Sequence, residues 1–137
     1  MFSKKSKDII EEKNYTKICA LLIHAAKIDQ NFSLNEENII KQTLVEIGAK
    51  NSDLIKIISE AKKIENDSNQ ILYFTKEVKS MTEINKTKIV EALWRIIYSN
   101  KVADIYETSL MRRLGGLLYI DDKIMGNIKD KIRKLSQ

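Results

Sequence analysis

The residues whose types and spacing come closest to a functional site lie between two helical patterns, in the segment KIDQNFSLNEENII, residues 27–40. As a twelve-residue calcium loop beginning at Asp29, this segment offers side-chain oxygen atoms at the third, fifth and ninth positions, from Asn31, Ser33 and Glu37. The sixth position requires glycine and has Leu34, and the twelfth requires a bidentate glutamate and has Ile40. The segment is therefore an incomplete calcium loop.

This segment has two interpretations. In the first, Asp29 stabilises a turn, Ser33 caps the next helix, and Glu37 interacts with the free amides at the positive end of that helix. In the second, Asp29, Asn31 and Glu37 form a weak divalent-metal site whose occupancy changes the affinity for a partner. We prefer the structural interpretation and keep the metal site as the alternative.

The other residues capable of catalysis lack partners of the right kind. His24 is the only histidine, so a catalytic triad or a two-histidine metal site would rest on one residue, and we expect it to line a groove or lie in the core. Cys19 lies in the apolar run ICALLI, and we expect its thiol to be buried and inert. The sequence predicts no enzyme, and no cofactor apart from the weak divalent cation of the alternative.

Composition and charge indicate a single helical domain. The 137 residues contain no proline and only 4 glycines, 43% are apolar, and no apolar run approaches the ~18 residues of a membrane span. The start of the chain, MFSKKSKDIIEEK, has charges where a signal peptide has its apolar core. We expect one cytoplasmic domain over residues 1–137, with residues 1–7 disordered.

The net charge of +5 is the only compositional hint of a nucleic-acid partner. Its excess is mostly lysine, in a chain also rich in isoleucine and asparagine, which is the composition that a biased genome produces. Charges of both signs alternate, as in KKIEND, and no glycine-rich strand with aromatic residues is present. We do not expect nucleic-acid binding.

A period of 3.6 residues dominates the chain and predicts an all-α fold of about seven helices in a compact bundle. The expected segments are residues 8–28, 33–48, 52–64, 71–81, 82–98, 104–118 and 122–135. Ser33 and Glu36 have the spacing of a capping box, Ser52 and Thr82 are expected to cap the third and fifth helices, and Gly48 to end the second. Trp94 lies in an almost wholly apolar helix and is expected to be a core residue.

A weak internal two-fold repeat relates the two halves of the chain. With a shift of 70 residues, apolar positions of residues 23–47 coincide with those of residues 93–117, and Glu37 coincides with Glu107. Each half then consists of a helix, a turn, a second helix, a short link and a third helix. We expect the two halves to pack against each other around one core, with residues 71–81 as the connector.

These residues carry a family resemblance over nearly the whole chain. The segments AAKIDQNFSLNEENIIKQTL and ALWRIIYSNKVADIYETSLMRRLGGLLYI resemble the tellurite-resistance TerB-like family, in its small single-domain branch. The turns of that family read approximately Asp-Gly-x-apolar-x-x-x-x-Glu, and its second half carries the motifs seen here as Trp94-Arg95, Arg112-Arg113 and Gly116-Leu117-Leu118-Tyr119. The chain departs from the pattern at Gln30 and Asn100, where the family prefers glycine, and at Ser99, where it prefers aspartate.

The resemblance implies a non-enzymatic interaction or sensing module in a bacterial stress or envelope-linked system, and the family's association with metal-stress operons supports the alternative metal site. We expect a protein partner, membrane-associated or not, and leave a homodimer open. Adjacent arginines point about 100° apart on a helix, so at most one of Arg112 and Arg113 can pair internally. The candidate partner-binding residues are Asp104, Glu107, Arg112 and Arg113.

Overall fold

The computed structural model of the chain describes residues 10, 12–28, 32–67, 71–100 and 105–135. Within these residues the ordered elements are seven α-helices and two short 3₁₀ helices, with no β-strand, so the all-α prediction is confirmed. The α-helices are α2 (Glu12–Ala26), α3 (Leu34–Glu46), α4 (Leu54–Asp67), α5 (Ile71–Lys79), α6 (Glu83–Ile97), α7 (Ile105–Leu117) and α8 (Asp122–Leu135). The 3₁₀ helices are η1 (Asn51–Asp53) and η2 (Tyr98–Asn100).

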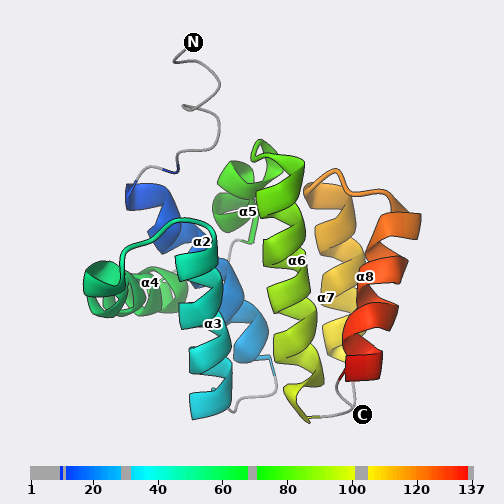
Figure 1. The fold of residues 1–137 in the computed structure, drawn as a ribbon, viewed down its shortest axis with the longest axis horizontal. Helices are drawn as coiled ribbons and strands as arrows, with labels where there is room; N and C mark the ends of the chain where they lie inside the picture. The colour runs from blue at the N-terminus through cyan, green and yellow to red at the C-terminus, as the bar shows by residue number, and fades with distance from the viewer. Residues whose placement is uncertain (1–9, 11, 29–31, 68–70, 101–104, 136–137) are drawn as a thin grey trace.

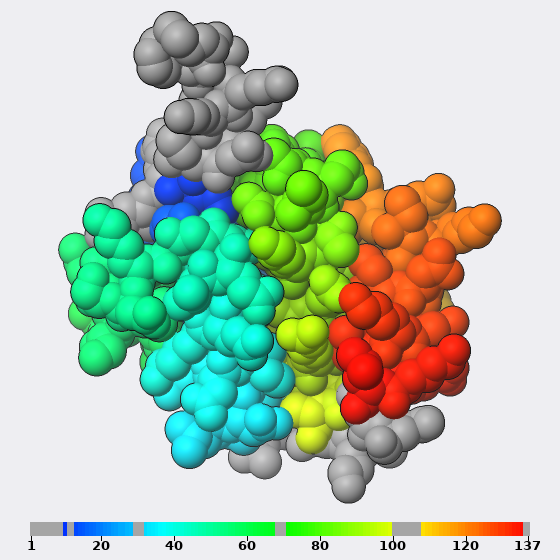
Figure 2. Space-filling model, in the orientation of Figure 1, coloured from blue at the N-terminus to red at the C-terminus, as the bar shows by residue number. Residues whose placement is uncertain are grey.

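Helices α2 and α6 form the centre of the bundle. Helix α2 packs against α3, α4, α5 and α6, while α6 also packs against α3 and α8 (Figure 1). The apolar residues of α2 from Ile18 to Ala26 are buried almost completely, because the helix is covered from several sides. On the face shown in Figure 2, the end of α6 lies between α3 on one side and α8 on the other.

The predicted repeat is visible in the helix boundaries. Helices α2 and α6 end 71 positions apart, at Ala26 and Ile97. Helices α3 and α7 also end 71 positions apart, at Glu46 and Leu117. The spacing is one residue longer than the predicted shift of 70, so Glu37 corresponds to Thr108 and not to Glu107. The pairing of α2 with α4 is repeated by that of α6 with α8, and α5 connects the two halves.

Equivalent turns end the second helix of each half. Gly48 follows α3 with φ of 116°, and the amide of the next residue, Ala49, donates to Leu44 five positions back at 2.9 Å. Tyr119, 71 positions after Gly48, has φ of 57°, and the amide of Ile120 donates to Gly115 at 2.9 Å. A Cβ atom at position 48 would lie 2.7 Å from the Tyr15 hydroxyl, so glycine is required there.

The helix starts agree with the sequence in two cases of three. Ser33 and Glu36 form the predicted capping box, with the Glu36 amide donating to Ser33 Oγ at 3.1 Å and the Ser33 amide to Glu36 Oε1 at 2.7 Å. Thr82 accepts from the Asn85 amide and caps α6 as predicted. The prediction for Ser52 was wrong, because this residue lies inside η1 and the α-helix begins only at Leu54.

The sequence predicts a disordered start of the chain and no membrane-spanning segment. Residues 1–7, predicted to be disordered, lie outside the described residues. In the part of the chain that the structure describes, every helix is too short or too polar to cross a lipid bilayer.

Candidate functional site

The predicted metal site is described only at Glu37, because Asp29 and Asn31 lie outside the described residues. Glu37 is in the first turn of α3, and its carboxylate oxygens lie 3.6 Å from the ammonium groups of both Lys41 and Lys62. A divalent cation bound to Glu37 would have to displace these two positive charges. The described residues contain no cluster of three or more potential metal ligands, and the metal site stays a prediction.

Lys62 and its surroundings form a hollow of about 430 Å³ between α2 and α4, with Phe32 at its edge. The Lys62 ammonium lies 5.6 Å from the centre of the Phe32 ring, within the range of a cation–π contact. Phe32 thus brings the segment before α3 against α4. The lysine, placed between Glu37 and an aromatic ring, contributes to holding α3 on α4.

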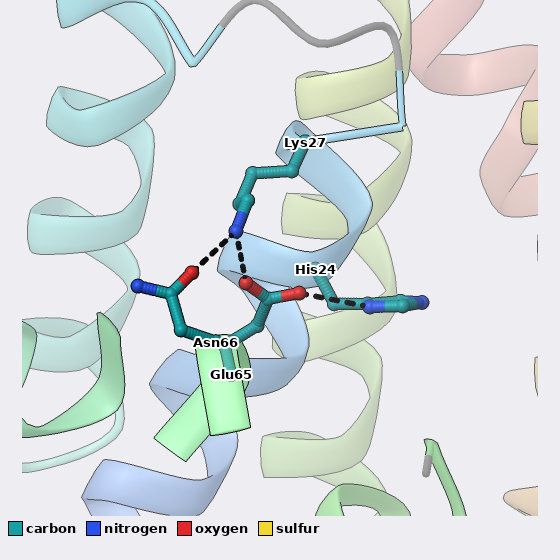
Figure 3. Close-up of polar contacts among 4 residues, drawn as sticks. All are labelled: His24, Lys27, Glu65 and Asn66. Atoms are coloured by element: carbon teal, nitrogen blue, oxygen red, sulfur yellow. Dashed lines mark hydrogen bonds and ion pairs between the residues drawn. The ribbon is translucent and has the colours of Figure 1, made fainter. Parts of the chain in front are cut away.

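A buried carboxylate at the α2–α4 contact was not foreseen from the sequence. The side chain of Glu65 on α4 is only 5% exposed. One of its carboxylate oxygens accepts a hydrogen bond from the Lys27 ammonium, and the other lies 3.2 Å from His24 Nδ1 (Figure 3). Lys27 also donates to Asn66 Oδ1 at 2.9 Å. Because a buried charge is stable only when paired, these contacts fix the end of α4 to the end of α2.

His24 and Cys19, the two residues with side chains capable of catalysis, both lie in surroundings that hold the fold together. His24 is partly buried, with its Nδ1 atom 3.2 Å from a Glu65 carboxylate oxygen, and it is not one of the core residues; the expectation that it lines a groove stays a prediction. Cys19 is fully buried, and burial raises the pKa of its thiol from 9.0 to about 12, with smaller opposing effects from Lys62 and Glu37. The thiol is therefore protonated at neutral pH, when it is a poor nucleophile.

The predicted partner-binding residues lie on or next to α7. Arg112 and Arg113 are both exposed, and neither guanidinium has an ion pair among the residues that the structure describes. Asp104 lies outside the described residues, and for Glu107 the structure describes the helical backbone but not the side chain. The two arginines differ in their surroundings, because Arg112 borders a hollow between α6, α7 and α8 and Arg113 is not among its described lining residues.

This hollow, named here the indole hollow, has a volume of about 160 Å³. Its described lining residues are Trp94, Thr108, Met111, Arg112, Asp122, Met125, Gly126 and Lys129. Trp94 is 3% exposed, which confirms that it is a core residue, and its ring stacks on Tyr98 with centroids 5.9 Å apart. The Lys129 ammonium lies 5.5 Å from the centre of the indole ring.

The indole nitrogen of Trp94 is unusual in the core. Its Nε1 atom is buried and has no hydrogen-bond acceptor in the part of the chain that the structure describes. A buried donor without an acceptor costs about 1–3 kcal/mol, and native proteins contain few such groups. The sequence reveals that a tryptophan lies in an apolar helix, but the missing acceptor depends on how α7 and α8 pack over the ring.

The four-residue spacing of Glu91 and Arg95 predicts that they share the one exposed stripe of α6. Both residues are partly exposed, whereas residues 92–94 and 96–98 are buried, so this prediction is confirmed. In the structure, Glu91 accepts from Lys131 on α8 at 2.7 Å, which is an inter-helix contact. Arg95 makes no ion pair with the described residues and instead borders a second hollow.

Fold and site together define a class of protein: an all-α domain in which a unit of three helices occurs twice, joined by a connecting helix. The sequence model of the family "Tellurite resistance protein TerB" matches residues 16–130, and the chain belongs to this family. A search of curated proteins gave no match, and neither did a search of solved structures.

Proposed function

We propose that this TerB-family domain is a non-enzymatic, cytoplasmic interaction module of a tellurite-resistance-related stress system. Its partner is a protein segment that carries a carboxylate side chain, and the indole hollow receives that side chain. The observation that carries the proposal is that Trp94, whose buried indole N–H has no acceptor among the described residues, lines a hollow that Arg112 and Lys129 also border.

The charges around the hollow favour an acidic ligand. Arg112 and Lys129 border it with one carboxylate, Asp122, which leaves an excess of positive charge. The guanidinium of Arg112 is exposed and has a planar pair of donors suited to a carboxylate. Elsewhere on α8, Lys131 and Arg133 are paired with Glu91 and Asp130, so the excess positive charge at the hollow comes from Arg112 and Lys129. These charges would attract an acidic segment before it makes close contact.

The apolar lining suits an adaptable contact. Met111 and Met125 border the hollow, and methionine side chains adjust to different partners because they are unbranched and polarizable. The Nε1 atom of Trp94 is buried, so a ligand reaches it only if binding moves the side chains that cover it; a carboxylate oxygen would then be the acceptor that the indole N–H lacks, and the methylene groups of the same side chain would lie against the two methionines. The Trp94 N–H would then lack an acceptor only in the free protein, because the acceptor is a carboxylate of the partner.

The experiment uses the fluorescence of Trp94, which is the only tryptophan in the chain. A panel of synthetic peptides with glutamate or aspartate among apolar residues is titrated against the protein, beside the same peptides carrying glutamine or asparagine. We expect acidic peptides to bind and change the emission of Trp94, and their amide versions to bind at least tenfold more weakly, since hydrogen bonds to charged groups contribute about 1.5–3 kcal/mol.

Arg112→Gln and Arg113→Gln form a matched pair for this experiment. Both residues are exposed neighbours on α7, but only Arg112 is among the residues that border the hollow. We expect Arg112→Gln to weaken peptide binding about tenfold or more and Arg113→Gln to change it less than about threefold. Peptides that bind both variants equally well, or that bind without any change in tryptophan emission, would contradict the proposal.

A further inference from the structure

A second hollow, separate from the indole hollow, lies between the start of α3, the end of α6 and the end of α8, and its volume is about 330 Å³. Figure 2 shows this region of the surface, where the end of α6 lies between α3 and α8. The volume is in the range of pockets that hold small organic molecules. None of the described residues that border this hollow also borders the indole hollow.

Arg95 is the only charged residue among the described residues that border this second hollow. Arg95 is partly buried as a residue, and its guanidinium has no ion pair or side-chain hydrogen bond with the part of the chain that the structure describes. On α8, which contributes Ile132 and Leu135 to the hollow, Asp130 and Arg133 pair with each other at 3.4 Å. The positive charge of Arg95 is therefore not neutralised within the described residues, and the hollow favours an anion.

The remaining lining is largely apolar. Ile39 and Ile132 form part of the wall, and Leu135 at the end of α8 borders the same hollow although its side chain is 68% exposed. An exposed leucine beside a hollow loses its contact with water when an apolar ligand covers it, which contributes binding free energy. Tyr98 and Asn35 add polar groups that can contact the head of the ligand.

We propose that this second hollow binds a small aliphatic monocarboxylate, a free acid with a chain of medium length. Its carboxylate pairs with the guanidinium of Arg95, and its hydrocarbon chain lies along Ile39, Ile132 and Leu135. Such a ligand matches both features of the site, because a simple anion would leave the apolar wall uncovered and a neutral lipid would leave the charge unpaired. The inference goes beyond the proposed function, because it assigns a small-molecule site to residues that the proposed peptide site does not use.

Isothermal titration calorimetry of the whole chain with octanoate, hexanoate, 1-octanol and inorganic phosphate tests the inference. We expect octanoate to bind about tenfold more tightly than hexanoate, since each buried methylene group is worth about a factor of three to four. We expect octanol and phosphate to bind at least tenfold more weakly than octanoate, because octanol has no charge to pair with Arg95 and phosphate has no hydrocarbon chain to cover the apolar wall. Equal binding of octanoate and octanol, or of octanoate and hexanoate, would overturn the proposal, as would no binding of octanoate at all.

Two substitutions in the second hollow test whether octanoate binds there. Arg95→Gln should weaken octanoate binding at least tenfold and leave the melting temperature nearly unchanged, because Arg95 has no ion pair to lose among the described residues. Leu135→Ala removes an exposed side chain and should weaken octanoate binding about threefold or more without disturbing the core. Arg113→Gln, an exposed arginine elsewhere, is the control and should change binding less than twofold. If Arg95→Gln and Leu135→Ala bind octanoate like the unaltered protein, the hollow is not the site and the proposal is wrong.

Discussion

Replacing Trp94 by alanine and by phenylalanine tests the state of the indole N–H directly. Trp94 is 3% exposed and stacks on Tyr98, so Trp94→Ala leaves a cavity and should cost about 3–5 kcal/mol of unfolding free energy. At about 3–5 °C per kcal/mol for a domain of this size, the melting temperature should fall by roughly 10–20 °C.

Trp94→Phe should behave very differently. The smaller ring loses contacts worth about 1–2 kcal/mol, but the substitution also removes a buried N–H that has no acceptor among the described residues. Removing such a group recovers about 1–3 kcal/mol. The two effects nearly cancel, so the free energy of unfolding should change by only about 1 kcal/mol and the melting temperature by about 5 °C or less.

The assay is chemical denaturation followed by far-ultraviolet circular dichroism, because the variants contain no tryptophan to report on unfolding. A second outcome is expected in the peptide titration, where Trp94→Phe should fold normally and lose affinity for the acidic peptides, measured by calorimetry. If Trp94→Phe were as unstable as Trp94→Ala, the indole N–H would have an acceptor in the folded protein, and the explanation of the indole hollow would be refuted.

Three further predictions concern the other half of the chain. Glu65→Gln should lower the unfolding free energy by about 1–2 kcal/mol in chemical denaturation, because it breaks a buried but partly screened ion pair, whereas the exposed Glu60→Gln on the same helix should change it by less than about 0.5 kcal/mol. The raised pKa of Cys19 means that folding favours the neutral thiol, so its contribution to stability is complete below pH 9 and is lost as the pH rises toward about 12, by about 1.4 kcal/mol per unit. Cys19→Ala should lack this component of the alkaline destabilisation, and a parallel decline in both proteins would contradict it. Millimolar calcium, magnesium or manganese should raise the melting temperature by less than about 2 °C if the first turn is structural, and a larger shift that disappears in Asp29→Asn and Glu37→Gln would establish the metal site.

The sequence predicted the fold well because local patterns determine helices. The capping box at Ser33, the cap at Thr82 and the end of α3 at Gly48 each depend on residues within a few positions of one another. The repeat was also visible, since both halves bury apolar residues at the same spacing. The predicted start of α4 was wrong, because Ser52 and the residues beside it form a 3₁₀ helix. The preference of serine for helix caps does not distinguish such a turn from the first turn of an α-helix.

The candidate sites depended on contacts that the sequence does not display. Glu65 lies one residue beyond the predicted end of the third helix, and its partners His24 and Lys27 are 41 and 38 positions away in the sequence. Likewise, the pattern showed that Trp94 is buried but not that its N–H lacks an acceptor, and it showed that Glu91 lies on the exposed stripe of α6 but not that Lys131 on α8 pairs with it. Helix periodicity gives the buried face of a helix, whereas the polar partners on its edges depend on the packing of neighbouring helices.

The interaction of Arg112 with the carboxylate of a bound peptide is measured most directly by a double-mutant cycle. The affinities of the protein and of Arg112→Gln are determined for an acidic peptide and for the same peptide with its glutamate replaced by glutamine. If the glutamate enters the indole hollow beside Arg112, the coupling free energy should be about 1 kcal/mol or more, and the same cycle with Arg113→Gln should give less than about 0.5 kcal/mol. A coupling near zero for Arg112, with the peptide still bound, would show that its carboxylate does not enter this hollow.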